Sequence, residues 1–565
     1  MTGGFFTNGS NGEGGLPSSL PMGTVVGGSL TEGVDIRLNP TGDILIEDVK
    51  VGTFVTIRGQ RYRFFGVVTD LELNSSDARL RHAPPDSNDP VLLEAVSGTM
   101  AYGVVSVLPN MVLPLVSGSD ERPAAAKTVP SHFSPAFPAT AADVAAVFGQ
   151  EDDRHFWIGA PLDMDTRVCL DLDNLVRRSF GVFGKSGTGK TFLTRLLLVG
   201  ILQGGEASSL IFDMHSEYGW SGQDSDRDRQ VKGLKQLFPS RVSTFTLDED
   251  SSRRRGSSPD EVVKIGYGEI EPEDIELLKD NLNLSDVAAS AAFNLKQRFG
   301  GNWLGEFLQR GGADLGELAD ELGVNRAALG ALHNRLSRFQ RFPFLEAGNR
   351  HNAAATIIEH LELGKHVVLE FGRYGRDLSA YILVSNLLSR RIHERYVELK
   401  EAAEGGQGSD PRPLVIVIEE AHRFLSPTIA SQTTFANIAR ELRKYNVTLM
   451  VIDQRPGSID SEVMSQLGTR ITCALDNERD IDAVLSGTSG SRQLRGVLAR
   501  LEEKQQALIF GHAVPMPVVV HTREYGTPES YAELTARVGA RVAEVGRPVE
   551  TREERVEREI DELFT

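Results

Sequence analysis

The feature that most constrains this chain is the octapeptide GKSGTGKT, which lies between an apolar run, SFGVF, and an amphipathic run, FLTRLLLVGIL. It matches the phosphate-binding loop G-x-x-x-x-G-K-[ST], in the strand-then-helix context that this loop requires. Its backbone N–H groups can surround a β-phosphate, Lys190 can reach the β- and γ-phosphates, and the Thr191 hydroxyl can ligate Mg²⁺. We therefore expect ATP and Mg²⁺ as cofactors, bound by Gly184, Lys185, Ser186, Gly187, Thr188, Gly189, Lys190 and Thr191.

Short apolar runs, each followed by a helical pattern, recur after Trp157 and predict an α/β fold whose parallel sheet is covered on both faces. They are SFGVFG, SLIFD, HVVLEF, LVIVIEE, VTLMVIDQ, RITCALD and QALIFG. The alternation stops over residues 251–360, where helical segments such as DVAASAAFNLKQRF predominate. We expect a helical insertion there, dividing an ATPase core into residues 151–250 and 361–525.

The flanking regions have other compositions. Short β-rich runs separated by turns occupy residues 33–116 and predict an N-terminal β-barrel. Residues 1–32, rich in Gly and Ser, indicate a disordered tail, and residues 117–150, rich in Pro and Ala, a linker or arm. Residues 526–565 form a charged amphipathic pattern that predicts a C-terminal helical tail, either a solvated helix or a latch between subunits.

Composition excludes several classes of protein. The only cysteines, Cys169 and Cys473, lie about 300 residues apart, which excludes a disulfide framework and a cysteine-type zinc site. No run approaches the roughly 20 apolar residues of a membrane span, and the N-terminus lacks a secretory pattern, so we expect a cytoplasmic protein. A net charge of −18 repels nucleic acid at long range, so any such binding needs a local basic surface.

Two further apolar runs end in groups suited to hydrolysis. LVIVIEE delivers Glu419 and Glu420 to the carboxyl end of a strand, where open α/β sheets bind ligands. Side chains alternate there, so we assign Glu419 to the Mg²⁺ shell and Glu420 to the catalytic base that polarises the attacking water. VTLMVIDQ ends at Gln454, which could sense the γ-phosphate or orient the water from a neighbouring strand, and the alternative is an ordinary residue of the turn after the strand.

The helix before that strand, FANIARELRKYN, carries Arg440, Arg443 and Lys444. A guanidinium offered to the γ-phosphate of a neighbouring subunit would act as an arginine finger, and solvated helix charges are the alternative. The run at residues 253–255, RRR, lies in a Ser-rich segment, where we favour a solvated loop over a phosphate contact.

The segment IFDMHSEYG places Asp213, His215 and Glu217 just after a strand. These side chains would share one side of an extended backbone and could in principle ligate a metal. We favour a capping and hydrogen-bonding role beside the nucleotide.

Taken together, the motifs resemble those of the HerA family of DNA-translocating ATPases, relatives of FtsK. LVRRSFGVFGKSGTGKT, IFDMHSEYG, IEEAHRFL, IARELRKYNVTLMVIDQRP and a closing ALIFG strand follow in that family's order. The resemblance implies a RecA-like core with a HAS-type barrel, a homohexameric ring with ATP sites between subunits, and duplex DNA in its channel. It also implies arginines donated in trans, namely Arg178 and either Arg440 or Arg443. Two departures are Glu419, often Asp, and Asp453, where a small residue is common.

This resemblance implies an ATP-driven duplex-DNA translocase or helicase that works with a nuclease of the NurA type in end resection and repair. An alternative is the ATPase of an anti-phage defence complex that organises a nuclease or sirtuin-type effector. A secretion-coupling ATPase is a third candidate, but that class usually carries N-terminal membrane spans and none is visible here.

Overall fold

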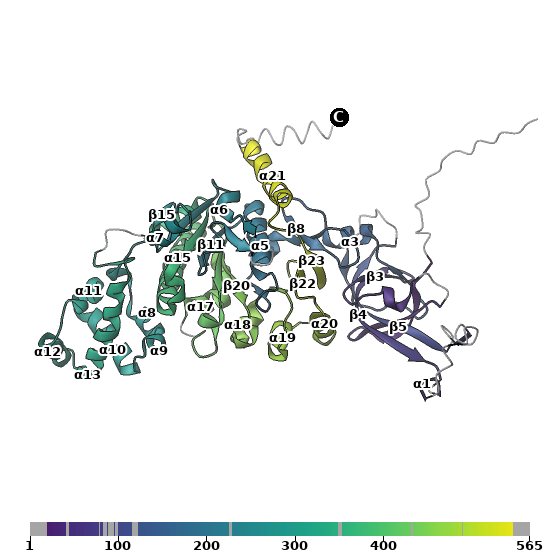
Figure 1. Cartoon of the computed structure of the whole chain (residues 1–565), viewed down its shortest axis with the longest axis horizontal. Coiled ribbons are helices and arrows are strands. Elements are labelled where there is room, and N and C mark those ends of the chain that lie inside the picture. Colours follow the sequence, from purple (N-terminus) through teal and green to yellow (C-terminus); the bar gives the residue numbers. More distant parts are fainter. Residues whose placement is uncertain are drawn as a thin grey trace, which may run out of the picture.

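Figure 1 shows the computed structural model of the chain, an elongated molecule with a barrel at one end and a helical insertion at the other. The structure describes residues 20–545 except for 41–43, 78, 83–87, 89–94, 97–99, 116–122, 225–228, 349–352, 431–432 and 489. No described helix combines the length and apolar character needed to cross a membrane.

The N-terminal domain is a closed antiparallel barrel. The strands pair in the order β2, β1, β7, β3, β4, β5, and β5 returns to β2, with β6 added on the free side of β5. Alternate side chains such as Val25, Ile36 and Val105 fill the interior. The strands are β1 (Gly23–Ser29), β2 (Gly33–Leu38), β3 (Phe54–Arg58), β4 (Arg63–Ser75), β5 (Ala101–Leu113), β6 (Ala124–Ala125) and β7 (Pro135–Pro138).

The barrel extends beyond the range expected from the sequence. Strand β1 falls within the predicted tail, and β7 and helix α3 (Ala141–Phe148) fall within the predicted linker. β7 was missed because it is short and contains two prolines, which give no alternating pattern. Helix α3 does carry a local signal, because the Thr140 hydroxyl accepts from the Asp143 N–H while the Asp143 carboxylate accepts from the Thr140 N–H. Residues 1–19 lie outside the described part of the chain.

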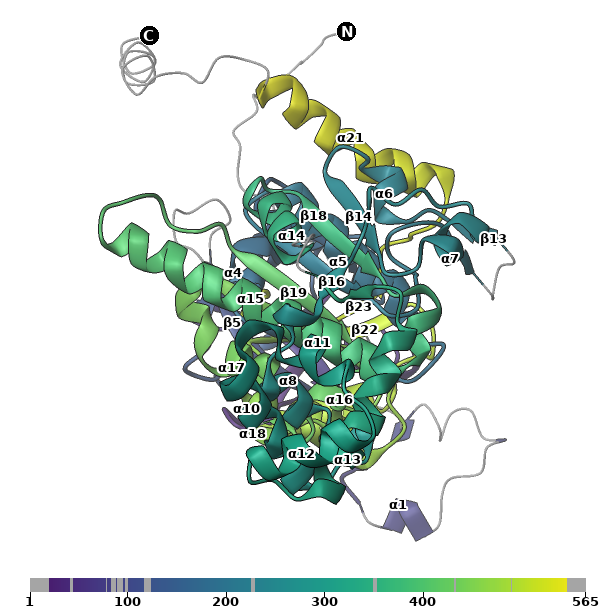
Figure 2. The same ribbon diagram turned by 90° about the vertical axis from the view of Figure 1, so that its left-hand side faces the viewer.

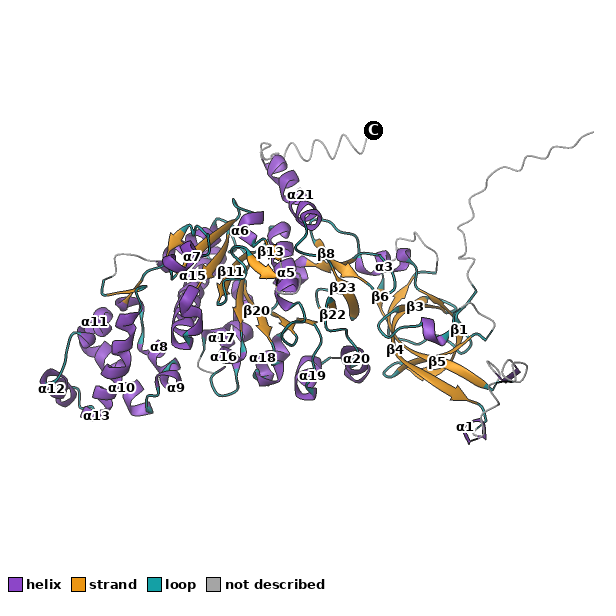
Figure 3. Ribbon diagram, viewed as in Figure 1, coloured by secondary structure: helices purple, strands orange, loops and turns teal. Residues whose placement is uncertain are grey.

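The second domain is built on one large sheet, whose strands are orange in Figure 3. Apolar clusters of side chains lie on both faces of the sheet. On β19, Leu414, Ile416 and Ile418 face one layer and Val415 and Val417 the other. The order is β15 (Glu261–Val262), β14 (Val242–Thr246), β18 (His366–Glu370), β11 (Ser208–Asp213), β19 (Leu414–Glu419), β20 (Val447–Asp453), β10 (Phe180–Phe183), β21 (Thr469–Thr472), β22 (Gln506–Gly511), β23 (Val518–Thr522), β8 (His155–Ala160) and β9 (Val168–Asp171).

The α/β class is confirmed, but the sheet is mixed rather than wholly parallel. From β15 to β21 neighbouring strands are parallel, whereas β22, β23, β8 and β9 are antiparallel additions. The apolar run QALIFG, expected in the parallel sheet, is β22 and runs against β21. A buried apolar run reports burial on both faces and carries no information about direction, which explains the error.

The helices of this domain connect and cover its strands. Helices α5 and α15 belong to opposite apolar layers. The helices are α4 (Leu172–Val176), α5 (Lys190–Gly204), α6 (Leu234–Leu237), α7 (Glu249–Arg254), α14 (Ala353–Glu362), α15 (Leu378–Glu404), α16 (His422–Leu425), α17 (Thr434–Glu441), α18 (Ser461–Gln466), α19 (Glu478–Leu485), α20 (Ser491–Leu498) and α21 (Pro528–Val545).

Along the chain, a helical insertion lies between β14 and β18, which are neighbours in the sheet (Figure 2). Its helices share the apolar layer of α15, and the Trp303 indole N–H donates to the Ile270 carbonyl at 2.9 Å. The residues predicted to be helical also contain short strands, and β15 among them extends the core sheet. The insertion comprises α8 (Pro272–Leu277), α9 (Lys279–Leu282), α10 (Asp286–Phe299), α11 (Trp303–Leu308), α12 (Ala313–Glu321) and α13 (Arg326–Leu336), with β16 (Ile265–Gly266) pairing with β17 (Leu345–Glu346).

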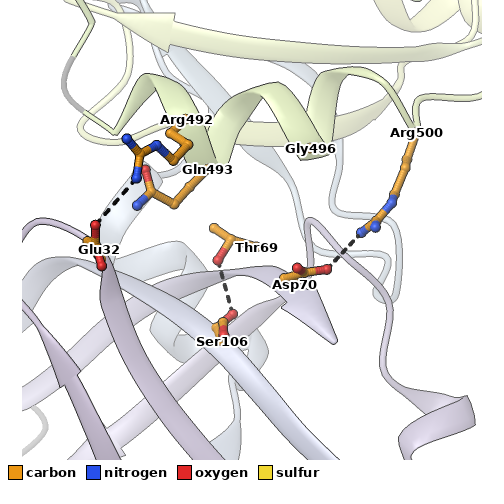
Figure 4. Close-up of a pocket in the computed structure, with 8 residues that line it drawn as sticks. All are labelled: Glu32, Thr69, Asp70, Ser106, Arg492, Gln493, Gly496 and Arg500. Carbon is orange, nitrogen blue, oxygen red and sulfur yellow. Dashed lines mark hydrogen bonds and ion pairs between the residues drawn. The ribbon is translucent and has the colours of Figure 1, made fainter. Parts of the chain in front are cut away.

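The barrel meets the core at α3 and at α20. Phe54 of β3 and Phe148 of α3 lie in one apolar cluster with their ring centroids 5.6 Å apart. Beside α20 a cavity of about 290 Å³ separates the two domains, and Figure 4 shows ion pairs across it, Arg492 to Glu32 at 3.5 Å and Arg500 to Asp70 at 3.3 Å. The junction thus combines an apolar contact with polar contacts at its rim.

Candidate nucleotide-binding site

The phosphate loop follows β10, between β20 and β21 at the carboxyl edge of the sheet. Gly187 and Gly189 have φ angles of +80° and +89°, which favour glycine. A Cβ on either would meet nothing within 4 Å, so their space is open, whereas one on Gly184 would lie 2.8 Å from the Cys473 Cβ. Helix α5 begins after Gly189 without a side-chain cap. Its first N–H groups are therefore suited to an anion.

The loop is held by its own backbone. The Lys190 ammonium and the Thr188 hydroxyl both donate to the carbonyl of Lys185, at 2.9 and 2.8 Å. Burial lowers the pKa of Lys190, although the charges of Cys473, Glu420, Asp453 and Glu419 oppose this shift. A phosphate would supply the strong acceptor that the ammonium now finds in a carbonyl.

Carboxylates converge on the first turn of α5. The Thr191 hydroxyl donates to Glu217 Oε2 at 3.0 Å, so an acid that sequence reasoning placed only beside the nucleotide touches the expected Mg²⁺ ligand. Asp213 holds Glu217 in place, because its buried carboxylate accepts from the N–H groups of Glu217 and Tyr218 at 2.8 and 2.9 Å. Burial, with the nearby charge of Glu370, raises the pKa of Asp213 to about 7.

The structure supports the hydrogen-bonding role for the trio after β11 rather than a metal site. His215 is exposed, away from the buried Asp213. Within the described residues no group of three or more His, Cys, Asp and Glu side chains is arranged to hold a metal by itself. Asp213 shapes the loop and Glu217 contacts the phosphate loop.

Glu419 is buried at the end of β19. Its Oε1 accepts from the Tyr218 hydroxyl at 2.7 Å, while its Oε2 is buried without a hydrogen-bond partner. Burial raises the pKa of Glu419 well above its usual range, and the charge of Asp213 adds to this shift. A buried carboxylate oxygen without a hydrogen-bond partner is unfavourable unless a cation lies next to it. The position of Glu419 beside the phosphate loop is therefore suited to binding a cation.

Glu420 differs from its neighbour. Its backbone has a φ of +49°, which turns the side chain out of the strand pattern. Gln454 donates from Nε2 to Glu420 Oε1 at 3.1 Å, and His422 Nδ1 lies 3.6 Å from Oε2. Asp453, the departure noted in the sequence, accepts from the His422 backbone N–H at 2.6 Å and from the N–H of Arg455 at 2.7 Å. It therefore ties the loop after β19 to the loop after β20.

The candidate arginines come from two places in the core domain, Arg178 before β10 and Arg440 and Arg443 on or next to α17. Arg178 precedes β10, at the strand end opposite to Gly184, and the four-residue strand between them spans roughly 13 Å. Arg440 of α17 pairs with Glu462 of α18 at 3.0 Å. Arg443 follows α17 in a short 3-10 turn, and its side chain lies outside the described part of the structure.

Several contacting residues carried no recognisable signal in the sequence. Lys185 pairs with Asp476 at 3.0 Å and with Glu503 at 2.7 Å, about 300 positions away along the chain. Tyr218 and His422 lie within the recognised motifs IFDMHSEYG and IEEAHRFL, but nothing in the spacing indicated that they would contact the two glutamates. These side-chain contacts form only in the folded sheet, where the ends of distant strands lie next to one another.

The residues present fit ATP with Mg²⁺. An uncapped helix start, an open glycine loop and Lys190 offer donors for phosphates, and Thr191 and Glu419 offer oxygens for the ion. Mg²⁺ in such sites is held by one or two protein groups with phosphates and waters, so a complete protein cage is not required. When bound, the ion would draw charge from the β- and γ-phosphates.

A helix-capping phosphate loop at this edge of such a sheet is the defining arrangement of the P-loop ATPases, and the chain is an ATP-hydrolysing enzyme of this class. Residues 156–392 match the central domain of helicase HerA and residues 22–92 match the HAS barrel domain, together more than half of the chain. The chain belongs to the HerA family, as the order of its motifs predicted.

Archaeal relatives align over most of the chain. A DNA double-strand break repair helicase HerA of Saccharolobus solfataricus is 26% identical over 68% of this chain and 72% of its own length. Another with that name, from Sulfurisphaera tokodaii, is 22% identical over 88% of this chain and 92% of its own. Among solved structures, VirB4 of Thermoanaerobacter pseudethanolicus is 14% identical, with a TM-score of 0.44 over 68% of this chain and 99% of that one.

Proposed function

We propose that this chain is the motor subunit of a homohexameric ring that translocates along duplex DNA during DNA repair, together with a partner nuclease in end resection. The observation that carries the proposal is the alignment with double-strand break repair helicases across both barrel and core. A phosphate loop with an adjacent acid pair supplies the hydrolysis that a motor requires.

In this proposal different residues carry out different steps of ATP binding and hydrolysis. The phosphate loop and Lys190 bind and orient the phosphates, while Thr191 and Glu419 hold the ion. Glu420 takes the proton of the attacking water, and Gln454, at 3.1 Å from it, orients that carboxylate and the water. Glu217 accepts a hydrogen bond from the Thr191 hydroxyl and so positions it.

The arginines would act between subunits. Arg178 stands at the far end of β10 from its own phosphate loop, which favours action on a neighbour's nucleotide. Arg440 and Arg443 lie on or next to α17 and are the other candidates. A trans guanidinium stabilises charge that develops in the transition state, so its loss should spare ATP binding and abolish turnover.

Steady-state ATP turnover by the purified chain, with and without linear duplex DNA over a range of salt, tests the proposal. We expect stimulation that falls as salt rises, no turnover in Lys190→Ala, and retained ATP binding without turnover in Glu420→Gln. A turnover rate that DNA leaves unchanged at every salt concentration, with the partner nuclease present, would contradict a DNA motor.

A further inference from the structure

The tip of the helical insertion has the form of a helix-turn-helix unit. Helices α12 and α13 are joined by four residues, 322–325, and lie at the end of the molecule farthest from the barrel (Figure 1). Helix α13 packs against both α12 and α10, which makes a three-helix arrangement. A turn of this length containing glycine is typical of helix-turn-helix motifs, whose second helix enters the major groove of DNA.

The turn is built by specific local interactions. Gly323 has a φ of +65°, and the N–H groups of Gly323 and Val324 donate to the carbonyls of Asp320 and Ala319 at 3.3 and 2.9 Å. This pair of bonds is a Schellman motif, which ends α12 sharply. Asn325 then begins α13, because its Oδ1 accepts from the N–H groups of the second and third residues after it, at 2.9 and 3.2 Å.

Helix α13 has one buried and one free face. Leu329, Leu332 and Leu336 are fully buried in the core of the insertion. The opposite face is exposed along a helical stripe that continues into the 3-10 turn Ser337–Arg341 and consists of Ala327, Ala331, Asn334, Arg338 and Arg341. Asn is a side chain that often reads adenine in the major groove, arginine also binds phosphates, and small residues allow the helix to approach closely.

Charge favours a polyanion on this face. Residues 326–341 contain four arginines and no acid, although the whole chain carries −18. Arg338 and Arg341 are exposed and make no ion pair with any described residue. The acids of this unit lie on α12 instead, and two of them are paired, Asp320 with Arg326 and Glu321 with Arg298. A polyanion would therefore approach from the α13 side.

From this geometry we infer that α12–turn–α13 is a second duplex-DNA contact, with the exposed face of α13 in the major groove and Arg338 and Arg341 on the phosphate backbone. The inference rests on the proposed action on DNA, but it requires neither ATP nor hydrolysis. In this inference the tip of the helical insertion is a second site at which the proposed motor binds duplex DNA.

The test is fluorescence anisotropy of a labelled linear duplex with the full chain, without nucleotide and in EDTA, over a range of KCl. Removing two phosphate contacts in Arg338→Ala/Arg341→Ala should make the negative slope of log affinity against log salt shallower by about 2. The control is Arg58→Ala/Arg61→Ala, two exposed arginines with the same spacing on the barrel, which should leave the slope unchanged.

A second pair of variants distinguishes a loss of DNA binding from a loss of folding. Ala331 is exposed on the stripe, and glutamate and glutamine are both good helix formers, so neither change should disturb the fold. Ala331→Glu brings a carboxylate against the phosphates and should weaken duplex binding at least about tenfold, whereas Ala331→Gln should weaken it far less. ATP turnover without DNA should be the same in all variants.

The outcomes separate the two proposals. If the wild-type chain binds no duplex at any salt concentration, the proposed action on DNA fails and this inference fails with it. If the wild type binds duplex but the α13 variants bind with the same affinity and salt slope, only this inference is overturned, and the face of α13 would then belong to a protein partner.

Discussion

At the scale of single residues, the site shows how one fold gives adjacent acids different properties. Glu419 is buried against Tyr218, whereas the positive φ of Glu420 turns it toward Gln454 and His422. Burial raises the pKa of Glu419, which favours its neutral form until a cation is present. Two carboxylates one position apart can therefore take separate roles in ion binding and in water activation.

The contact between Glu217 and Thr191 leads to a first prediction. Replacing Glu217 with Gln removes the negative charge beside the hydroxyl but keeps a hydrogen-bond acceptor. Changes in residues that orient a metal ligand typically cost 10- to 100-fold in metal affinity, so we expect a rise of about that size in the Mg²⁺ concentration for half-maximal ATP turnover. The exposed Glu206→Gln, at the far end of α5, is the control, and an unchanged Mg²⁺ dependence in Glu217→Gln would refute the role.

A buried histidine predicts a pH dependence of stability. Burial lowers the pKa of His366 to about 3, and Arg241 and Arg412 add to the shift. An unfolded imidazole titrates near pH ~6.5, so between these values the unfolded chain binds more protons, and the free energy of unfolding rises with pH. The contribution is complete above pH ~6.5 and is lost as pH falls, by about 2 kcal/mol between pH 6.5 and 5.

Thermal unfolding of His366→Gln at several pH values tests this contribution. The variant should lose part of the acid-induced fall in unfolding temperature that the wild type shows between pH 6.5 and 5. The exposed His132→Gln should retain it. Identical pH profiles for wild type and His366→Gln would rule out His366 as the cause.

At the scale of elements, the ends of helices decide where chemistry can occur. Helix α5 starts at a glycine without a side-chain cap and offers its N–H groups to phosphate, whereas α13 starts at Asn325, which uses its own side chain as the cap. Helix α12 ends in a glycine Schellman motif, after which the chain turns into α13. The first N–H groups of α5 are thus left available for a ligand, whereas those of α13 are already used by the Asn325 cap.

The Schellman turn predicts opposite effects for two glycines of one unit. Gly323→Ala forces a side chain into a φ of +65° and should destabilise the turn by about 1–2 kcal/mol. Gly316→Ala, inside α12 with nothing within 4 Å of the new Cβ, should stabilise it by about 0.5–1 kcal/mol. Hydrogen exchange of the α12–α13 amides should become faster in the first variant and slower in the second, and the same direction in both would contradict this account.

At the scale of the whole molecule, the barrel is attached to the core by two kinds of contact. Phe148 of α3 is buried with Phe54 and Phe65 of the barrel. The ion pairs around the cavity are largely exposed, with side-chain exposures of 86% for Arg492 and 57% for Arg500. Exposed pairs contribute about 0–1 kcal/mol each, whereas a buried phenylalanine contributes about 3–5 kcal/mol against alanine, so the apolar contact dominates.

Limited proteolysis and thermal unfolding can compare these contacts. Phe148→Ala should lower stability by about 3–5 kcal/mol and expose the barrel–core connection to cleavage. Arg492→Ala/Arg500→Ala should change stability by less than about 2 kcal/mol and leave the cleavage pattern as in the wild type. A larger loss of stability in Arg492→Ala/Arg500→Ala than in Phe148→Ala would contradict the conclusion that the apolar contact dominates.

The sequence by itself determined the nucleotide site in outline. The phosphate loop, the acids at the ends of β11 and β19, and Gln454 after β20 were all predicted, because each is a local pattern in which a buried apolar run ends in a polar group. The α/β class and the helical insertion followed from the same periodicities.

Only the tertiary structure decided which of these elements are neighbours. It made β1 and β7 part of the barrel, reversed β22 against β21, and brought Asp476 and Glu503 to Lys185. The physical reason is that an apolar pattern records which face of an element is buried, whereas pairing, direction and ion contacts depend on residues that are distant along the chain.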